Sequence, residues 1–375
     1  MSRLRVVIAG GGTGGHTSAG LAIAAALRGR VGAALELHWL GSHGGLESRQ
    51  VPAAGIPYHP IATGKLRRNL AWRNLSDLGV RVPAGLAQAW RRLGRLRPDV
   101  VVATGGFVAV PTALAAALRR YPILTHEQVA APGLANRVVG RLADRVAVTF
   151  AASARAFPTG RVVVTGNPVR PEIMCGERAR GFARFGLDPA LPLVYVTGGA
   201  QGAHRINRLV GHALEPLLAT CHIVHQCGDN EYDDAGWLAE QAAALPAALR
   251  LRYRVVPFVT DELPDLYAAA SLVVSRAGAG TVTELCALGR PGVLVPLPDA
   301  RGDEQTANAR VLSDAGAAVL LPERELSATR LTAIVQELLA DAGRLKEMGD
   351  QARSLATPDA ATRLVDLILE LGGHH

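Results

Sequence analysis

The residues best suited to chemistry lie in the segment Ser275–Pro296, which follows a short apolar strand, Leu272–Val274, and contains two glycines and then a helix. Gly278 and Gly280 lie at the expected start of that helix, and Glu284 is expected in its first turn. Free backbone N–H groups and the positive end of the helix dipole suit such a turn to an anion. A neighbouring carboxylate accepts hydrogen bonds from hydroxyl groups. A diphosphate beside a polyol is a sugar nucleotide, which is the ligand that this segment predicts.

Two other glycine-rich segments also follow a strand and precede a helix. Gly10, Gly12 and Gly15 match the G-x-G-x-x-G pattern of dinucleotide-binding domains, and Thr197–Ala203 is the second segment. The strand after the first pattern ends at Trp39–Ser42 without the acidic residue that binds a cofactor ribose, so a nicotinamide or flavin cofactor is disfavoured. Ligands of open α/β sheets bind at the carboxyl ends of strands, so we expect these loops to line one cleft. The alternative is that their glycines only permit turns with positive φ.

Polar side chains near these loops are candidates for binding and proton transfer. His16 follows the first loop, where a helix N-terminus favours the neutral imidazole that a general base needs, although a helix cap or a packing histidine explains its position equally well. Gln305 and Asn308 are one helical turn apart and would present their amides to one point, as sugar hydroxyls require, or they belong to an ordinary polar helix start. No Asp-x-Asp pair occurs, so we expect no metal, and Arg170 is the candidate to neutralise a diphosphate.

Composition limits the class of protein. The chain has 375 residues, which favours two domains, and its net charge of +8 favours a polyanionic partner, unless it reflects an arginine-rich coding bias. The four cysteines lack C-x-x-C spacing, which indicates reduced thiols and no disulfide or zinc framework. We expect no signal peptide, and no apolar run reaches the ~18 residues that a membrane span needs.

One segment, Lys65–Arg97, combines basic and apolar residues. It contains nine Lys or Arg residues and one Asp, so its charge equals that of the whole chain. Cationic residues interleaved with Trp and Leu suit a surface that lies on anionic lipid. The alternative is a core helix with solvated arginines. Nucleic acid ranks below both, because no recognition motif accompanies the charge.

Short β-rich runs alternate with Ala- and Leu-rich helical stretches along the chain. One series begins at Arg5–Ala9 and a second begins at Leu193–Thr197, which is followed by an expected helix over Ala203–Leu217. Alternation of this kind predicts parallel sheets with right-handed crossovers. We therefore predict an α/β protein of two doubly wound, Rossmann-like domains that meet near Gly166–Pro171.

Several motifs occur together in a fixed order, and as a set they are specific. These motifs are Gly11–His16, His126–Gln128, Gly166–Arg170, Gly198–Ala203, Gly278–Glu284 and Glu304–Asn308. Over nearly the whole chain they resemble the MurG family of bacterial glycosyltransferases. The resemblance implies a GT-B fold and an inverting, metal-independent enzyme of peptidoglycan synthesis with no cofactor. It would move N-acetylglucosamine from UDP-GlcNAc to the 4-hydroxyl of undecaprenyl-diphosphate-MurNAc-pentapeptide, which converts lipid I to lipid II.

The resemblance also implies where the parts of the enzyme lie. Residues 1–167 would form an acceptor- and membrane-facing domain, on which a C-terminal helix at about 352–371 packs back. Residues 168–351 would bind the UDP-sugar, and the protein would be peripheral at the cytoplasmic face of the membrane. The implied catalytic residues are His16 and Glu127. The implied donor site comprises Thr13, Gly14, Gly15, Arg170, Ala200, Gln201, Gly202, Val259, Ala279, Gly280, Thr281, Glu284, Glu304, Gln305 and Asn308. The implied acceptor and membrane residues are Phe107, Trp72, Leu75, Trp90, Arg91 and Arg92.

Three positions depart from the pattern of the family. Val129 replaces an asparagine, Ala200 a serine and Phe107 a tyrosine. These changes leave open a paralogue, or a non-catalytic binder, that acts on another lipid-linked diphosphate, as in antibiotic assembly or self-resistance. A UDP-sugar epimerase of the same fold is a further alternative, which the basic segment disfavours.

Overall fold

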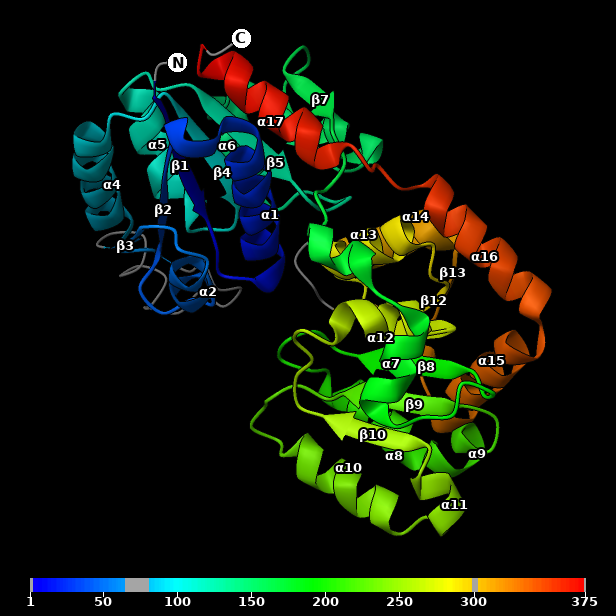
Figure 1. The fold of residues 1–375 in the computed structure, drawn as a ribbon. Coiled ribbons are helices and arrows are strands. Elements are labelled where there is room, and N and C mark those ends of the chain that lie inside the picture. The colour runs from blue at the N-terminus through cyan, green and yellow to red at the C-terminus, as the bar shows by residue number, and fades with distance from the viewer. Residues whose placement is uncertain (1–2, 65–80, 299–302, 374–375) are drawn as a thin grey trace. The chain divides into compact units, whose positions relative to one another are not determined.

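The computed structural model describes residues 3–64, 81–298 and 303–373. By its internal contacts the chain forms two compact units. The N-terminal unit comprises Met1–Val169 with Thr357–His375, and the C-terminal unit comprises Arg170–Ala356. Both are doubly wound parallel sheets covered by helices, which confirms the predicted fold class (Figure 1).

The N-terminal unit is built on a parallel sheet of seven strands in the order β3-β2-β1-β4-β5-β6-β7. The strands are β1 (Leu4–Gly10), β2 (Leu35–Ser42), β3 (Tyr58–Ile61), β4 (Val100–Gly105), β5 (Ile123–Glu127), β6 (Arg145–Val148) and β7 (Val162–Val164). Central strands such as β4 are buried along their whole length, as the unbroken valine run Val100–Val102 predicts for a sheet covered on both faces. Because β4 pairs with both β1 and β5, the loops that follow these strands meet at one edge of the sheet.

Helices cover both faces of this sheet. They are α1 (Gly14–Val31), α2 (Glu47–Ala53), α4 (Val82–Leu96), α5 (Ala109–Leu118), α6 (Leu134–Leu142) and α17 (Ala360–Leu371). The last of these, α17, contacts α1, β4 and β5 within the N-terminal unit. Its apolar stripe, with Leu364, Val365 and Ile368 almost fully buried, joins the same core as Ile8 and Trp39. The C-terminal end of the chain is therefore part of the N-terminal core.

The C-terminal unit has a parallel sheet of six strands in the order β10-β9-β8-β11-β12-β13. The strands are β8 (Leu193–Thr197), β9 (His222–Gln226), β10 (Tyr253–Val256), β11 (Leu272–Ser275), β12 (Gly292–Leu294) and β13 (Ala318–Leu320). The helices are α7 (Arg178–Phe185), α8 (His204–His212), α9 (Leu214–Leu218), α10 (Asp234–Ala243), α11 (Ala247–Arg250), α12 (Leu263–Ala269), α13 (Ala279–Leu288), α14 (Glu304–Asp314), α15 (Ala328–Ala340) and α16 (Ala342–Ser354).

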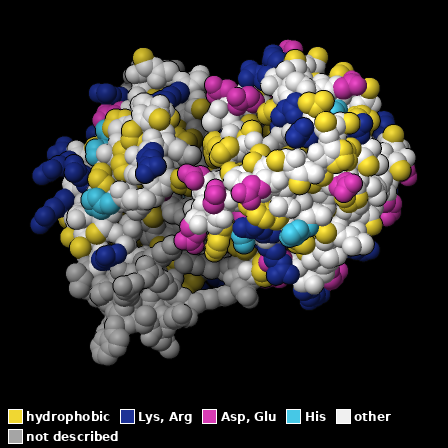
Figure 2. All heavy atoms as spheres, turned by 90° about the horizontal axis from the view of Figure 1, so that it is seen from below, with side chains coloured by type: hydrophobic (Ala, Val, Ile, Leu, Met, Phe, Trp, Pro, Cys, Tyr) yellow, Lys and Arg dark blue, Asp and Glu magenta, His cyan; other side chains and the backbone are white. Residues whose placement is uncertain are grey.

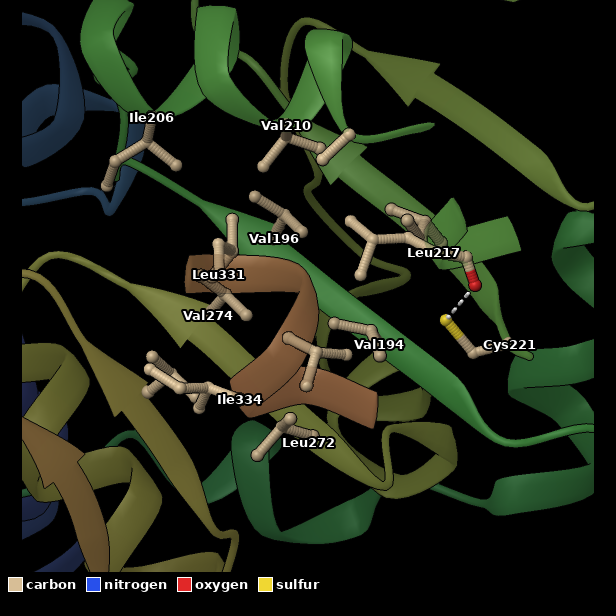
Figure 3. Packing of buried hydrophobic residues seen from close by; sticks show 14 of the residues in the cluster. Val194, Val196, Ile206, Val210, Leu217, Cys221, Leu272, Val274, Leu331 and Ile334 are labelled. Atoms are coloured by element: carbon tan, nitrogen blue, oxygen red, sulfur yellow. Dashed lines mark hydrogen bonds between the residues drawn. The ribbon is translucent and has the colours of Figure 1, made fainter. Parts of the chain in front are cut away.

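Figure 3 shows how the core of this unit is assembled from distant segments. Val194 and Val196 of β8 belong to one cluster with Val210 of α8 and Leu331 of α15, and Val196 lies next to Val210. Cys221 packs with them, and its thiol donates a hydrogen bond of 3.2 Å to the carbonyl oxygen of Leu217. The core fixes β8 and β11 and so positions the loops at their carboxyl ends.

Two expectations about local structure were wrong. The helix expected over Ala203–Leu217 is divided into α8 and α9 at Ala213, whose φ of −102° and ψ of 3° lie outside the helical region. Glu284 lies in the second turn of α13, because that helix begins at Ala279. Over residues 3–64, 81–298 and 303–373, no helix combines the length and the apolar character that crossing a bilayer requires.

Candidate functional site

Within the part of the chain that the structure describes, the start of α13 offers backbone donors for which no protein acceptor is recorded. Gly278 is the N-cap residue, with a φ of −65° and a ψ of 147°, and it makes no side-chain cap. The N–H groups of Ala279, Gly280 and Thr281 lie in the first turn, where a helix provides no acceptor. A Cβ atom at Gly278 or Gly280 would meet no described atom within 4 Å, so internal packing does not require glycine there. This backbone is open to the close approach of an anion.

The other two glycine loops use backbone N–H groups internally. In the first loop, Gly12 N donates to the Glu47 carboxylate at 3.1 Å. In the second, Gly199 N donates to the Thr197 hydroxyl at 3.0 Å, and Gly202 N donates to the Gly199 carbonyl oxygen at 3.0 Å. The sequence treats the three loops as equivalent, but the structure distinguishes them. Thr13 caps the helix after the first loop, whereas neither α8 nor α13, which follow the other two loops, has a side-chain cap. The start of α13 differs from that of α8 in having a glycine, Gly280, within its first turn.

Glu47 is a buried carboxylate that shapes the first loop and that the sequence did not reveal. Its side chain is 0% exposed. Besides the bond from Gly12, it accepts hydrogen bonds from the backbone N–H and the hydroxyl of Ser42, at 3.2 and 2.5 Å. A Cβ atom at Gly11 or Gly45 would collide with this carboxylate, so these glycines make room for it. Glu47 thus ties the end of β2 to the loop after β1.

Glu284 faces the site from α13 and is held by a tyrosine of α12. The Tyr267 hydroxyl donates a hydrogen bond of 2.9 Å to Glu284 Oε2. Burial raises the pKa of Glu284, while this hydrogen bond and the positive charge of Arg170 act in the opposite direction. Arg170 is exposed and belongs to the same unit, so a charged acceptor of hydroxyl groups and a guanidinium act on one region of the C-terminal unit.

The polar residues at the start of α14 do not converge as expected. Gln305 Oε1 accepts a hydrogen bond of 3.0 Å from Leu297 N, whereas Asn308 is fully buried and donates one of 3.1 Å to the Ala277 carbonyl oxygen. The two amides therefore serve different backbone groups. Because Ala277 precedes Gly278, Asn308 supports the loop at the start of α13. Glu304 is the first residue of α14.

The remaining donor candidates differ in exposure. Ala200 and Gln201 are exposed in the second glycine loop. Val259 is 5% exposed, whereas the preceding Phe258 is 50% exposed. The Val259 side chain is therefore not available to a ligand. A contact of Val259 with a flat ring would come from its backbone, as the resemblance implies.

In the N-terminal unit, a glutamine fixes the tautomer of His16. His16 Nδ1 lies 2.6 Å from Gln128 Oε1, and Gln128 Nε2 donates to the carbonyl oxygens of Thr104 and His126, at 2.7 and 3.0 Å. Carbonyl oxygens only accept, so the Gln128 oxygen must face His16, and His16 Nδ1 must carry the proton. Burial lowers the pKa of His16. His16 is thus a neutral imidazole whose Nε2 carries the lone pair, as a general base requires.

Glu127 precedes Gln128 in the chain and is buried at 0% exposure. Its carboxylate accepts hydrogen bonds from Val129 N at 3.0 Å and from Asn136 Nδ2 at 2.8 Å. Gly105, with a φ of +106°, lets the His16 ring and Asn136 lie close to the backbone after β4. A Cβ atom at Gly105 would lie 2.7 Å from the His16 ring and 3.0 Å from Asn136 Nδ2. Sequence reasoning placed Gln128 only in the motif His126–Gln128 and gave it no role, and it did not identify Asn136, although both lie within ten residues of Glu127.

The residues around the start of α1 complete this cluster. Thr13 is the N-cap residue, and its hydroxyl accepts a hydrogen bond of 3.5 Å from His16 N. Gly14 and Gly15 are exposed beside it. Phe107 is half-buried in the loop after β4.

The described part of the basic segment is an amphipathic helix. Trp72 and Leu75 lie outside the described residues. In α4, Gly85, Ala89 and Leu93 are buried, whereas Arg91, Arg92 and Arg95 are exposed. Trp90 is 38% exposed and carries the Arg119 guanidinium 4.0 Å from its ring. Figure 2 shows Lys and Arg side chains gathered at the left edge of the view, where Figure 1 places α4.

Comparisons with known proteins identify the family of the chain. Residues 6–148 match the glycosyltransferase family 28 N-terminal domain, and residues 193–364 match the C-terminal domain. The chain is 40% identical to the UDP-N-acetylglucosamine--N-acetylmuramyl-(pentapeptide) pyrophosphoryl-undecaprenol N-acetylglucosamine transferase of Desulforudis audaxviator (strain MP104C), over 99% of each protein. The chain belongs to the MurG family. A second MurG-family relative of the same name, from Nocardioides sp. (strain ATCC BAA-499 / JS614), is 42% identical and covers 98% of each.

Solved structures place the fold in the same group. The crystal structure of Acinetobacter baumannii MurG matches with a TM-score of 0.76 and 32% identity, covering 98% of this chain and 99% of that one. A UDP-GlcNAc 2-epimerase from Neisseria meningitidis matches with a TM-score of 0.68 at 13% identity, over 99% of this chain and 100% of that one, which shows a shared fold alone. In the described ranges, no group of three or more His, Cys, Asp or Glu side chains is placed to hold a metal ion.

Proposed function

We propose that this MurG-family enzyme moves N-acetylglucosamine from UDP-GlcNAc to the 4-hydroxyl of a lipid-linked MurNAc-pentapeptide, with inversion at the anomeric carbon. The observation that carries the proposal is the uncapped start of α13 beside Glu284, in a chain that matches transferases of this name over its full length. Backbone donors aimed at a leaving diphosphate stabilise the charge that develops as the bond to the sugar breaks.

In this proposal the C-terminal unit binds the donor. The first turn of α13, including Ala279–Thr281, holds the diphosphate, and Arg170 supplies the positive charge. Glu284 accepts hydrogen bonds from the ribose hydroxyls, and the Val259 backbone contacts the uracil. The second loop, Ala200–Gly202, and the start of α14, with Glu304 and Gln305, enclose the sugar, while the buried Asn308 supports the loop before α13 through the Ala277 carbonyl oxygen.

In the same proposal the N-terminal unit binds the acceptor and removes its proton. The acceptor oxygen attacks the anomeric carbon, the bond from that carbon to the phosphate oxygen breaks, and its electron pair leaves with UDP. His16 Nε2 takes the hydroxyl proton. Glu127, which touches Val129 N and Asn136 and is buried, acts by holding the loop that carries Gln128. Thr13–Gly15 face the reacting diphosphates, and Phe107 contacts the acceptor.

We further propose that α4 rests on the anionic cytoplasmic face of the membrane, where a lipid-linked acceptor lies. Its exposed arginines support this proposal, because each cation near an anionic leaflet contributes about 1 kcal/mol. The N-terminal unit would then bind the lipid-linked acceptor at the membrane surface. Nucleic acid would not be a partner.

Replacing Arg91, Arg92 and Arg95 together by Gln should weaken binding to phosphatidylserine-containing vesicles by about 100-fold at low salt. Cosedimentation at several salt concentrations measures this effect. The matched control replaces Arg250, Arg324 and Arg330, which are exposed on the C-terminal unit, and loses the same charge. Equal vesicle binding by the two triple variants would contradict a specific role for α4.

Incubation with a panel of UDP-sugars and a short-chain lipid I analogue tests the function. We expect a product whose mass increases by one N-acetylhexosamine, and only with both substrates present. Conversion of UDP-GlcNAc without the acceptor would support the epimerase alternative instead. Binding of both substrates without turnover would support a non-catalytic binder, which Val129 and Ala200 leave open.

A further inference from the structure

The residue that contacts Glu284 comes from a different helix and was not among the candidate site residues. Tyr267 is 2% exposed, and its hydroxyl donates the hydrogen bond of 2.9 Å to Glu284 Oε2. Among the described residues, no other donor bonds to this carboxylate. The contact leaves Oε1 to accept a hydrogen bond from a ligand.

Tyr267 is itself fixed by buried aromatic packing. Its ring meets the Tyr195 ring edge-on, with 5.5 Å between ring centroids and an interplanar angle of 84°. Tyr195 is 2% exposed, and its hydroxyl donates to Gln226 Oε1 at 2.9 Å. Gln226 Nε2 in turn donates to the Gly199 carbonyl oxygen at 3.1 Å. Buried side chains therefore connect the carboxylate on α13 with the second glycine loop.

The protonation states of Tyr267 and Glu284 favour a hydrogen bond in which the tyrosine hydroxyl donates and the carboxylate accepts. Burial raises the pKa of Tyr267 well above its usual value, so the hydroxyl stays protonated and donates. Burial also raises the pKa of Glu284, and the bond from Tyr267 opposes that effect. Without the hydroxyl, Glu284 would lose the contact that orients it and that favours its ionised form.

We propose that Tyr267 is a positioning residue that holds the Glu284 carboxylate against the ribose and thereby sets the preference for a ribonucleotide over a 2′-deoxyribonucleotide donor. The proposal rests on the assignment of Glu284 to the ribose hydroxyls in the proposed function. A carboxylate held by one oxygen can offer the other to the ribose at a fixed angle, whereas a freely rotating carboxylate cannot. The chain through Tyr195 and Gln226 resists displacement of the ring.

Calorimetric titration of Tyr267→Phe with UDP and with 2′-deoxy-UDP tests this proposal. We expect UDP affinity to fall about 10-fold while affinity for 2′-deoxy-UDP changes much less, because the hydrogen bond lost is one to a charged group. The loss should grow as the pH falls from 8 to 5.5, since the unsupported carboxyl protonates more readily. In steady-state assays KM for UDP-GlcNAc should rise while kcat stays near the wild-type value.

A second buried tyrosine provides the control. Tyr253 is 5% exposed, and its hydroxyl bonds to His225 Nδ1 at 2.9 Å rather than to Glu284. Tyr253→Phe removes a buried hydroxyl from the same unit and should leave the ratio of the two affinities unchanged. An equal loss of affinity for both nucleotides in Tyr267→Phe would mean that Tyr267 serves packing alone and would overturn the proposal.

These measurements also distinguish failure of the proposed role of Tyr267 from failure of the proposed ribose contact of Glu284. If the wild-type protein binds UDP and 2′-deoxy-UDP equally well, the ribose assignment of Glu284 fails. If the wild type discriminates and Tyr267→Phe discriminates equally well, the assignment of Glu284 stands and the role of Tyr267 is wrong.

Discussion

His16→Ala lowers kcat by about 100- to 10,000-fold while UDP affinity stays close to the wild-type value. This is the range that loss of a positioned general base produces. The bond to Gln128 fixes the proton on Nδ1, so Nε2 is available to take the acceptor proton. His16 and the proposed donor site belong to different compact units, so the donor contacts should persist. Steady-state kinetics with a lipid I analogue, together with calorimetry for UDP, measures both quantities.

The pH dependence gives an independent check on His16. Burial lowers the pKa of His16 below its ordinary value of about 6.5, so the neutral base persists in more acidic solution. The acid limb of kcat/KM should therefore lie below pH 6.5. His43→Ala removes an exposed histidine from the same unit and should change neither kcat nor this limb. Wild-type turnover by His16→Ala would remove His16 from the mechanism.

Glu284→Gln weakens UDP binding by about 100-fold. Hydrogen bonds to a charged carboxylate contribute about 1.5–3 kcal/mol each, and two ribose hydroxyls are available, so a loss near 3 kcal/mol is expected. The glutamine keeps the shape of the side chain and an acceptor for Tyr267. Calorimetric titration with UDP measures the loss.

The stability of the ligand-free protein should change in the other direction. Burial raises the folded-state pKa of Glu284 above its unfolded value, so its ionised form destabilises the fold at neutral pH. Glu284→Gln should therefore unfold at the same temperature as the wild type or slightly higher. Glu337→Gln, which changes an exposed carboxylate of the same unit, should leave UDP affinity unchanged. Unaltered UDP affinity in Glu284→Gln would refute the donor-site assignment.

Most of the strands that sequence patterns predicted are central strands buried on both faces, although the edge strands β7 and β10 were also expected. Val100–Val102 and Val194–Val196 are nearly continuous apolar runs, as central parallel strands require. The strands not expected, β3 and β13, lie at the edges of their sheets. They are four and three residues long, and β3 contains Pro60, which edge strands tolerate. The short edge strand β7 was expected because it is an unbroken valine run, whereas β3 and β13 contain no such run of β-branched residues.

The sequence predicted the glycine loops of the site but not the buried side chains that hydrogen-bond to its residues. Glycine spacing located the start of α13, because the requirement for open backbone is local. Whether an N–H group is free depends on residues that the fold brings near, such as Glu47, which takes the N–H of Gly12 from 35 positions away. Tyr267 similarly reaches Glu284 across 17 positions and from another helix. No local pattern encodes such contacts, because they depend on tertiary packing.

A crystal structure with bound UDP tests the central claim most directly. The account predicts that the diphosphate oxygens lie within hydrogen-bond distance of the N–H groups of Ala279–Thr281 and that the ribose hydroxyls contact Glu284. A well-ordered UDP molecule whose phosphates bind elsewhere, with the first turn of α13 facing only water, would contradict it.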